Sequence, residues 1–149
     1  MKKAFYLAPL MAMTLAGHAM AETCEVEIDS NDMMQYDKSE LTVSKDCEKV
    51  TVNLTHSGSQ AVAVMGHNWV LAETSEWQAL ATDAMAAGPD KDYLPDGDER
   101  VLAHTDLIGG GESTSVTFDL SELDPEGDYT FFCSFPGHSY QMNGKFIIE

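Results

Sequence analysis

The sequence predicts an all-β fold, a two-sheet antiparallel sandwich that carries one short inserted helix. Apolar and polar residues alternate in several short runs, turn-forming residues separate these runs, and a single segment has helical spacing. The chain has 149 residues, of which 44% are hydrophobic and 22% charged, so it suits one globular domain with a real core. This composition excludes a disordered or fibrous protein.

The first residues have the pattern of a secretory signal peptide. Two lysines precede an apolar stretch, residues 4–15, and an Ala-Met-Ala sequence ends at Ala21. We expect residues 1–21 to be removed and residues 22–149 to form the single exported domain. The apolar stretch is shorter than the about 20 residues that a membrane-spanning helix needs, so no membrane span is expected. The alternative is that residues 1–21 are retained as an amphipathic membrane anchor.

The chain is strongly acidic. It has 25 acidic and 8 basic residues, a formal charge of −17; without Lys2 and Lys3, 6 basic residues remain and the charge is −19. Repulsion from phosphate excludes nucleic acid as a partner and disfavours anionic lipid surfaces. Such a charge favours a basic protein partner, whose association would weaken with salt. An adaptation to a saline habitat explains the acidity equally well.

Seven segments are strand candidates. In residues 25–28, 50–54 and 116–120, apolar and polar residues alternate, as in a strand with one buried and one solvent-exposed face. The other candidates are short apolar runs between Gly, Ser, Asp and Pro clusters. The candidates are residues 25–28, 41–43, 50–54, 61–65, 116–120, 129–134 and 145–148.

The segment around residues 76–88 departs from this pattern and predicts the helix. Ser75 and Gln78 have the spacing of a capping box, and Gly88-Pro89 would end the helix. The apolar residues at helical spacing are Trp77, Leu80, Ala81, Ala84 and Met85.

Three cysteines lie in the exported part, so an oxidising compartment predicts one disulfide and one remaining thiol. Cys24 and Cys47 each lie beside a strand-like run, whereas Cys133 has a different setting. We therefore pair Cys24 with Cys47. Closing a loop of this length stabilises a fold by roughly 3 kcal/mol in the chain-entropy model.

The remaining thiol belongs to a cluster of metal-binding residue types. Cys133 is followed by His138 and Met142 in a Cys-x4-His-x3-Met pattern that turns through Pro-Gly. Two sulfurs and an imidazole select copper over calcium or magnesium, which prefer oxygen ligands. A fourth donor is still needed.

Three other histidines of the exported part are candidates for that donor. They are His56, His67 and His104, and only His67 lies in a short turn flanked by strand-like runs. A single histidine is most often structural, so His67 gains weight only in combination with the Cys-His-Met pattern.

These motifs resemble those of the azurins, bacterial periplasmic blue-copper proteins of the cupredoxin family. The likeness rests on Gly66-His67-Asn68-Trp69, on the Cys-x4-His-x3-Met pattern and on the two preceding cysteines, and it covers residues 22–149, including residues 90–94. Azurins have four residues between cysteine and histidine, whereas plastocyanins and pseudoazurins have two. The resemblance implies a Greek-key order for the sandwich and a periplasmic location.

The resemblance also implies the ligand set. Cys133, His67 and His138 would form a trigonal plane around one copper ion that changes between Cu(I) and Cu(II). Met142 would be a long axial ligand, and the carbonyl oxygen of Gly66 a weak second axial contact.

Two donors to the cysteine sulfur are implied as well, Asn68 and the backbone amide of Phe135. Such donors tune the reduction potential by damping charge donation from the thiolate. His56 and His104 are expected not to bind the metal.

The expected function is the transfer of electrons between other proteins, and not catalysis. The ligand set leaves no open position for a substrate, whereas catalytic metals usually keep one. We expect single electrons to pass between redox proteins, such as a basic c-type cytochrome and a terminal reductase, in transient complexes of a monomer. Copper buffering without electron transfer is the alternative.

Electrons should pass through the imidazole edge of His138, which azurins surround with an apolar docking patch. The chain departs from azurins at Gln60 and Gln141, where leucine is common. The matching patch positions are Met34, Val64, Met65, Phe135, Pro136 and Gly137.

Overall fold

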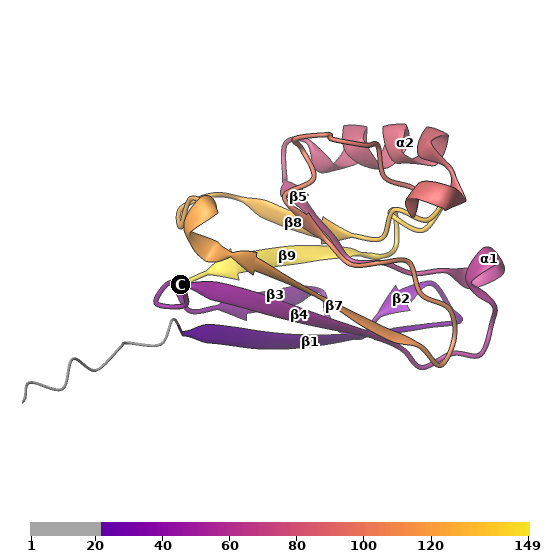
Figure 1. The fold of residues 1–149 in the computed structure, drawn as a ribbon, viewed down its shortest axis with the longest axis horizontal. Coiled ribbons are helices and arrows are strands. Elements are labelled where there is room, and N and C mark those ends of the chain that lie inside the picture. Colours follow the sequence, from indigo (N-terminus) through magenta and orange to yellow (C-terminus); the bar gives the residue numbers. More distant parts are fainter. Residues whose placement is uncertain (1–21) are drawn as a thin grey trace, which may run out of the picture.

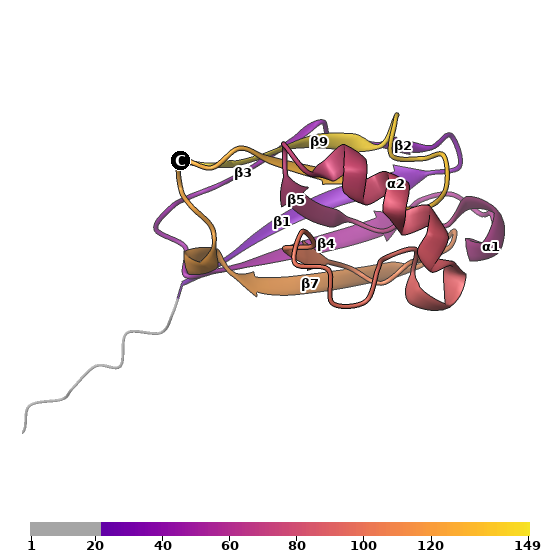
Figure 2. The same ribbon diagram turned by 90° about the horizontal axis from the view of Figure 1, so that it is seen from above.

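The computed structural model describes residues 22–149, which form two β-sheets packed face to face (Figures 1 and 2). The expected signal peptide, residues 1–21, lies outside the described residues. The first sheet has the order β2-β1-β4-β7 and comprises β1 Thr23–Asn31, β2 Gln35–Tyr36, β4 Lys49–His56 and β7 Ser113–Asp119. The second has the order β3-β9-β8-β5-β6 and comprises β3 Glu40–Val43, β5 Val70–Glu73, β6 Ala103–His104, β8 Tyr129–Phe132 and β9 Asn143–Ile148.

Both sheets are mixed, which corrects the expectation of purely antiparallel sheets. β1 pairs with β4 in parallel, and β3 pairs with β9 in parallel; the other pairs are antiparallel. The chain passes through β2 and then β3, a strand of the other sheet, before it returns as β4. β4 therefore runs beside β1 in the same direction, which a direct hairpin between the two strands would not allow. The two-layer cupredoxin-like sandwich itself is confirmed.

The core lies between the sheets and follows the predicted alternation. Val50, Val52 and Leu54 of β4 are fully buried, while the residues between them face outward. Trp69 lies in the middle of the core, with its ring centroid 6.0 Å from that of Phe131 and within 6.2 Å of two further phenylalanine rings. Aromatic packing at these distances adds to the free energy of burial.

The predicted helix is confirmed as α2, Trp77–Ala87, which lies over the outer face of the second sheet (Figure 1). Leu80 and Ala84 are buried, and the ring of Trp77 packs on that of Phe132 at 5.8 Å. The helix ends at Gly88, whose φ of 80° is readily adopted only by glycine. The predicted capping box is wrong, because Glu76 occupies the N-cap position without a side-chain cap.

Residues 61–65 were expected to form a strand and instead form helix α1, Val62–Met65. The amides of Val64 and Met65 both donate to the carbonyl oxygen of Ala61, at 2.9 and 3.0 Å, which closes a single turn. This segment pairs with no strand, and its valines are exposed, so its apolar run does not form a buried strand. Two 3-10 turns complete the fold, η1 Pro89–Lys91 and η2 Leu120–Glu122.

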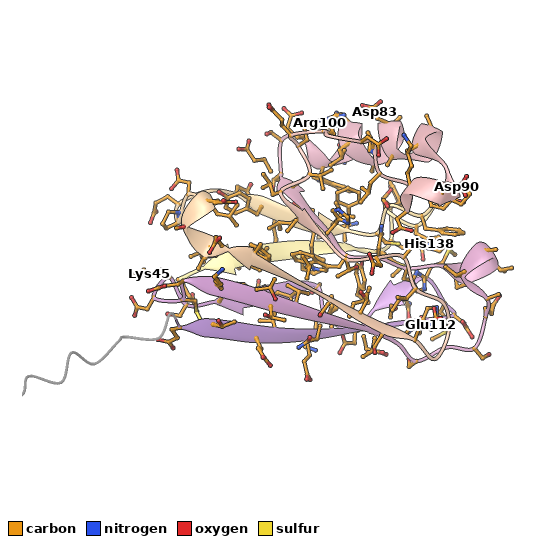
Figure 3. The ribbon with its side chains drawn as sticks, in the orientation of Figure 1. Lys45, Asp83, Asp90, Arg100, Glu112 and His138 are labelled. Carbon is orange, nitrogen blue, oxygen red and sulfur yellow. A yellow bond between two sulfur atoms is a disulfide. The ribbon has the colours of Figure 1, made fainter. Side chains whose placement is uncertain are left out.

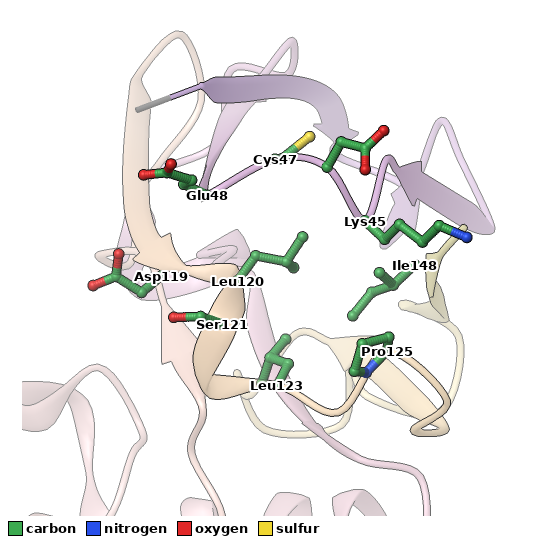
Figure 4. Close-up of a pocket in the computed structure, with 10 residues that line it drawn as sticks. Lys45, Cys47, Glu48, Asp119, Leu120, Ser121, Leu123, Pro125 and Ile148 are labelled. Carbon is green, nitrogen blue, oxygen red and sulfur yellow. The ribbon is translucent and has the colours of Figure 1, made fainter. Parts of the chain in front are cut away.

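The disulfide between Cys24 and Cys47 is confirmed, and it ties the start of β1 to the segment before β4. A hollow of about 450 Å³ lies beside it, lined by apolar side chains such as Leu120, Leu123 and Ile148 (Figure 4). Within residues 22–149, no helix combines the length and apolar content that crossing a membrane requires.

Candidate metal centre

One tight loop after β8 carries three of the predicted site residues. Cys133 follows the last residue of β8 directly, and its amide donates to the carbonyl oxygen of Met142 at 3.0 Å. The amide of Met142 in turn donates to the carbonyl oxygen of His138 at 2.8 Å, and that of His138 donates to Phe135 at 3.0 Å. These bonds fold the loop back on itself, so its cysteine and histidine face one point.

The second ligand segment lies between α1 and β5. His67 forms an isolated antiparallel bridge with Ile108, with both backbone hydrogen bonds at 2.9 Å. Its side chain points toward the Cys133 loop and is fully buried. Figure 3 shows His138 at the end of the molecule opposite Lys45, which lies in the segment before Cys47.

The three donor atoms form a triangle of a size that a metal ion fits. Sγ of Cys133 lies 3.9 Å from Nδ1 of His67 and 3.8 Å from Nδ1 of His138, and the two nitrogens are 3.2 Å apart. The circle through these atoms has a radius of about 2.1 Å, and metal–nitrogen and metal–sulfur bonds measure about 2.0–2.3 Å. A single ion at the centre therefore reaches all three donors without a rearrangement.

The hydrogen bond on the far side of His67 selects its metal-binding tautomer. Nε2 lies 2.8 Å from the carbonyl oxygen of Asn31, which only accepts, so Nε2 carries the proton. The lone pair of Nδ1 is then free and faces the triangle. Such a partner also fixes the ring orientation.

Burial controls the charge of all three donors in the metal-free protein. It lowers the pKa of His138 to about 4, with a further contribution from His67, whose own pKa is also lowered by burial. Both imidazoles are thus neutral near pH 7. Burial raises the pKa of the Cys133 thiol to about 12, although backbone amides of Asn68 and Phe135 oppose this rise. A bound cation would replace that thiol proton.

The Asn68 side chain joins the two ligand segments. Its Nδ2 donates to Oγ of Ser134 at 2.8 Å and to the carbonyl oxygen of Asp92 at 3.1 Å, and its Oδ1 accepts from the amide of Ser134 at 2.9 Å. Asp92 adopts a left-handed conformation with a φ of 51°. Sequence reasoning missed Ser134 and Asp92, because Asp92 takes part through its backbone carbonyl oxygen and Ser134 through its hydroxyl and amide, contacts that no local sequence pattern indicates.

Gly66 and Met142 were predicted as the weak axial contacts. The carbonyl oxygen of Gly66 is 3.9 Å from Sγ of Cys133. Met142 has a fully buried side chain, and its backbone bonds to those of Cys133 and His138. Any Cβ at position 66 would come within 2.5 Å of the Val62 carbonyl oxygen, so glycine is required by the close backbone approach.

His56 and His104 lie outside the triangle. His56 is buried and stacks on His67 at 4.5 Å, but Nε2 is 2.9 Å from the Met65 carbonyl oxygen and Nδ1 accepts from the amide of Gly58. His104 is exposed on β6. Both nitrogens of His56 therefore already have partners.

The residues of the expected docking patch near His138 reach the surface. All six expected patch residues are at least partly exposed, and the Phe135 ring packs on the His138 ring at 4.5 Å. Val64 is 61% exposed. Sequence reasoning did not include Met33, the neighbour of Met34, or Tyr140, which lines a hollow with Phe135 and Gly137; they are 66% and 88% exposed. Asp90 and Glu112 flank His138 in the view of Figure 3.

Comparison with known proteins agrees with this centre. Residues 22–149 match the family model of copper-binding proteins of the plastocyanin/azurin family. The chain is 54% identical to azurin of Pseudomonas chlororaphis, covering 85% of this chain and 98% of that one, and 50% identical to azurin of Pseudomonas aeruginosa, covering 91% of each. Among solved structures, an azurin from Methylomonas sp. strain J matches with a TM-score of 0.82 at 42% identity, covering 85% of this chain and 98% of that chain. Fold, donor triangle and sequence agree, and the chain belongs to the plastocyanin/azurin family of copper-binding proteins.

Proposed function

We propose that residues 22–149 work in the periplasm as a blue-copper electron-transfer domain, after removal of residues 1–21. The domain would pass single electrons between redox proteins, with a c-type cytochrome as donor and a terminal reductase as acceptor. The observation that carries this proposal is the buried triangle of His67, Cys133 and His138, because its soft and borderline donors suit copper.

Copper in this site supplies a one-electron couple between Cu(II) and Cu(I). His67, Cys133 and His138 would hold the ion, and Met142 and the carbonyl oxygen of Gly66 would be weaker donors to it. Burial and the hydrogen bonds of both ligand segments fix the donor atoms before metal binds. The same arrangement therefore serves both oxidation states, which favours rapid electron transfer over catalysis at an open coordination position.

His138 is the proposed route for the electron. It is 4% exposed, whereas His67 and Cys133 are fully buried, and its ring packs directly on that of Phe135, a residue of the proposed patch. A small apolar patch suits a transient complex, because a larger and more complementary interface would slow dissociation. Met34, Val64, Met65, Pro136 and Gly137 complete the proposed docking patch.

The decisive experiment mixes copper-loaded protein with a reduced basic c-type cytochrome in a stopped-flow spectrometer. Rapid and reversible bleaching of the blue band, matched by oxidation of the cytochrome, is expected. Protein loaded with Zn²⁺ provides the redox-inert control with the same surface. Retention of Cu(I) without any electron exchange would instead identify a copper buffer and contradict the proposal.

A further inference from the structure

The exposed large apolar side chains of the domain gather near the metal centre. Within residues 22–149 they are Met33, Val62, Val64, Met85 and Tyr140. Val62 and Val64 belong to α1, whose last residue lies two positions before the ligand His67. Tyr140 lies in the ligand loop itself, between His138 and Met142. The surface on which we place partner docking is therefore also where apolar side chains are most exposed.

Much of this apolar surface consists of methionine. Residues 22–149 contain Met33, Met34, Met65, Met85 and Met142. Met33 is 66% and Met85 49% exposed, Met34 and Met65 are partly exposed, and Met142 is fully buried. The buried methionine is the expected metal ligand, and the other four all reach solvent. We call these four, Met33, Met34, Met65 and Met85, the methionine rim.

Three rim residues lie in segments that contact or precede the ligand His67. The carbonyl oxygen of Asn31 lies 2.8 Å from Nε2 of His67, and Oδ1 of the same Asn31 accepts from the amide of Met33 at 2.8 Å. Met33 and Met34 thus belong to the turn that covers the outer edge of the His67 ring. Met65 lies two positions before His67 in the chain.

The fourth rim residue reaches the other ligand segment. Met85 of α2 lines a hollow of about 300 Å³ together with Phe135, Gly137 and Tyr140 of the ligand loop. The ring of Phe135 packs on that of His138 at 4.5 Å. The rim therefore adjoins both ligand segments, although its members come from three separate parts of the chain.

A thioether differs from the aliphatic side chains of leucine or valine in that a peroxide can oxidise it. The sulfur attacks one oxygen of hydrogen peroxide, the O–O bond breaks, an S–O bond forms, and the other oxygen leaves as water. The sulfur loses two electrons and the peroxide gains them, so each sulfoxide consumes one peroxide. The product is polar, and methionine sulfoxide reductases reverse the reaction.

We propose that the methionine rim is a modification site, at which hydrogen peroxide converts surface thioethers to sulfoxides and thereby weakens docking of the redox partner. The docking part of this inference rests on the proposed function. The buried Met142 keeps its thioether, so the modification changes the surface and leaves the metal centre intact.

Oxidation of the rim changes polarity without changing charge. A sulfoxide is neutral, so the long-range attraction between this acidic domain and a basic cytochrome is retained. The short-range apolar contact is lost, and a small docking surface depends on that contact for its free energy of binding. The partner should therefore still approach and then bind less tightly.

The first test follows oxidation residue by residue in Zn²⁺-loaded protein, which contains no redox-active ion. The protein is treated with hydrogen peroxide, the peroxide is removed with catalase, and peptides are analysed by mass spectrometry. Met33 and Met85 should gain an oxygen atom first and Met34 and Met65 next, while Met142 stays unmodified. Treated protein should leave a hydrophobic-interaction column earlier, because its surface has become more polar.

The matched control replaces all four rim methionines, as Met33→Leu/Met34→Leu/Met65→Leu/Met85→Leu. Leucine has a similar apolar volume and no sulfur to oxidise. Each protein is compared only with its own untreated sample, and peroxide should leave the column retention of this variant unchanged. If the variant does not fold, a methionine sulfoxide reductase takes its place, since the enzyme should restore the retention of treated wild-type protein.

The second test measures docking with copper-loaded protein and a reduced basic c-type cytochrome in a stopped-flow spectrometer. Peroxide treatment should lower the second-order rate constant about tenfold, roughly the effect of losing one buried apolar side chain from the contact. An uncharged small-molecule reductant needs no docking surface, so its rate constant should stay the same in the same samples. The blue band should also be retained, because Cys133 and Met142 are fully buried.

The inference is overturned if Met142 is oxidised as readily as Met33, if column retention does not change, or if oxidised protein reacts with the cytochrome as fast as untreated protein. Failure of the proposed function has a different signature, because untreated protein would then exchange no electrons with the cytochrome. The order of oxidation and the column retention need neither copper nor a partner, so they still decide whether the rim is a modification site.

Discussion

Nδ1 of His67 and Nδ1 of His138 lie 3.2 Å apart, although 71 residues separate them in the chain. The pairing of β5 with β8 brings them together. Val70, near the start of one strand, lies opposite Phe132, at the end of the other. Because the strands are antiparallel, the residues before β5 and after β8 leave the sheet at the same end.

Cys133→Ser should abolish the intense visible band of the copper-loaded protein, because the band arises from charge transfer between thiolate sulfur and copper. A visible and EPR spectrum after addition of Cu(II) measures this. The double variant Cys24→Ala/Cys47→Ala is the control, since it removes two sulfurs at the opposite end and should remain blue. An intensely blue Cys133→Ser protein would refute the ligand assignment.

Met142→Leu should keep the blue colour and raise the reduction potential, because it removes a weak axial donor that favours Cu(II). The two side chains have similar volumes, so the fold should lose less than about 1.5 kcal/mol. Redox titration measures the potential, with Met85→Leu on the exposed face of α2 as the matched control. An unchanged potential in both variants would show that Met142 is not an axial ligand.

The ligand loop could be predicted from sequence because its chemistry is local. Cys133, His138 and Met142 lie within ten residues, so their spacing already indicates a shared site. Ser134 and Asp92 gave no such indication, because their hydrogen bonds with Asn68 join segments whose proximity only the fold establishes.

In the fold, too, the features that could be predicted are those that show a local sequence pattern. The strand β4 alternates and was recognised, whereas β5 is buried on both faces and shows no alternation. β2 and β6 have only two residues each, too few to show a period. The parallel pairing of β1 with β4 depends on the path of the chain between them, which local patterns do not encode.

Loss of the disulfide should lower stability and spare the spectrum. Cys24→Ala/Cys47→Ala removes a bridge between two residues that are 23 positions apart in sequence, and the free energy of unfolding should fall by about 3 kcal/mol. Urea denaturation of the metal-free protein measures this, so that copper binding does not contribute. A loss below about 0.5 kcal/mol would mean that the unfolded chain gains little freedom when the bridge is removed.

Asp98 should make stability depend on acidic pH. Hydrogen bonds from the Arg100 side chain and amide lower the pKa of Asp98 from its ordinary value of 3.8 to about 2. A lowered folded-state pKa stabilises the protein fully above the ordinary value, and this contribution is lost as pH falls toward 2.

Asp98→Asn should therefore lower the melting temperature at pH 7, and the difference from wild type should shrink between pH 4 and pH 2. Asp46→Asn is the control, because no ion pair involves Asp46 within residues 22–149. A difference that stays constant down to pH 2 would exclude the ionic contribution of Asp98.

The acidity of the domain should govern how fast it meets a basic partner. Residues 22–149 carry a net charge of −19, and a basic cytochrome should be attracted over distances that salt shortens from about 30 Å at 0.01 M to about 3 Å at 1 M. The second-order rate constant for electron transfer should fall by a factor of about 10 or more across that range. An uncharged small-molecule reductant, measured in the same solutions, should show almost no salt dependence. If the cytochrome behaves like the neutral reductant, the charge does not steer association, and the acidity is better explained by a saline habitat.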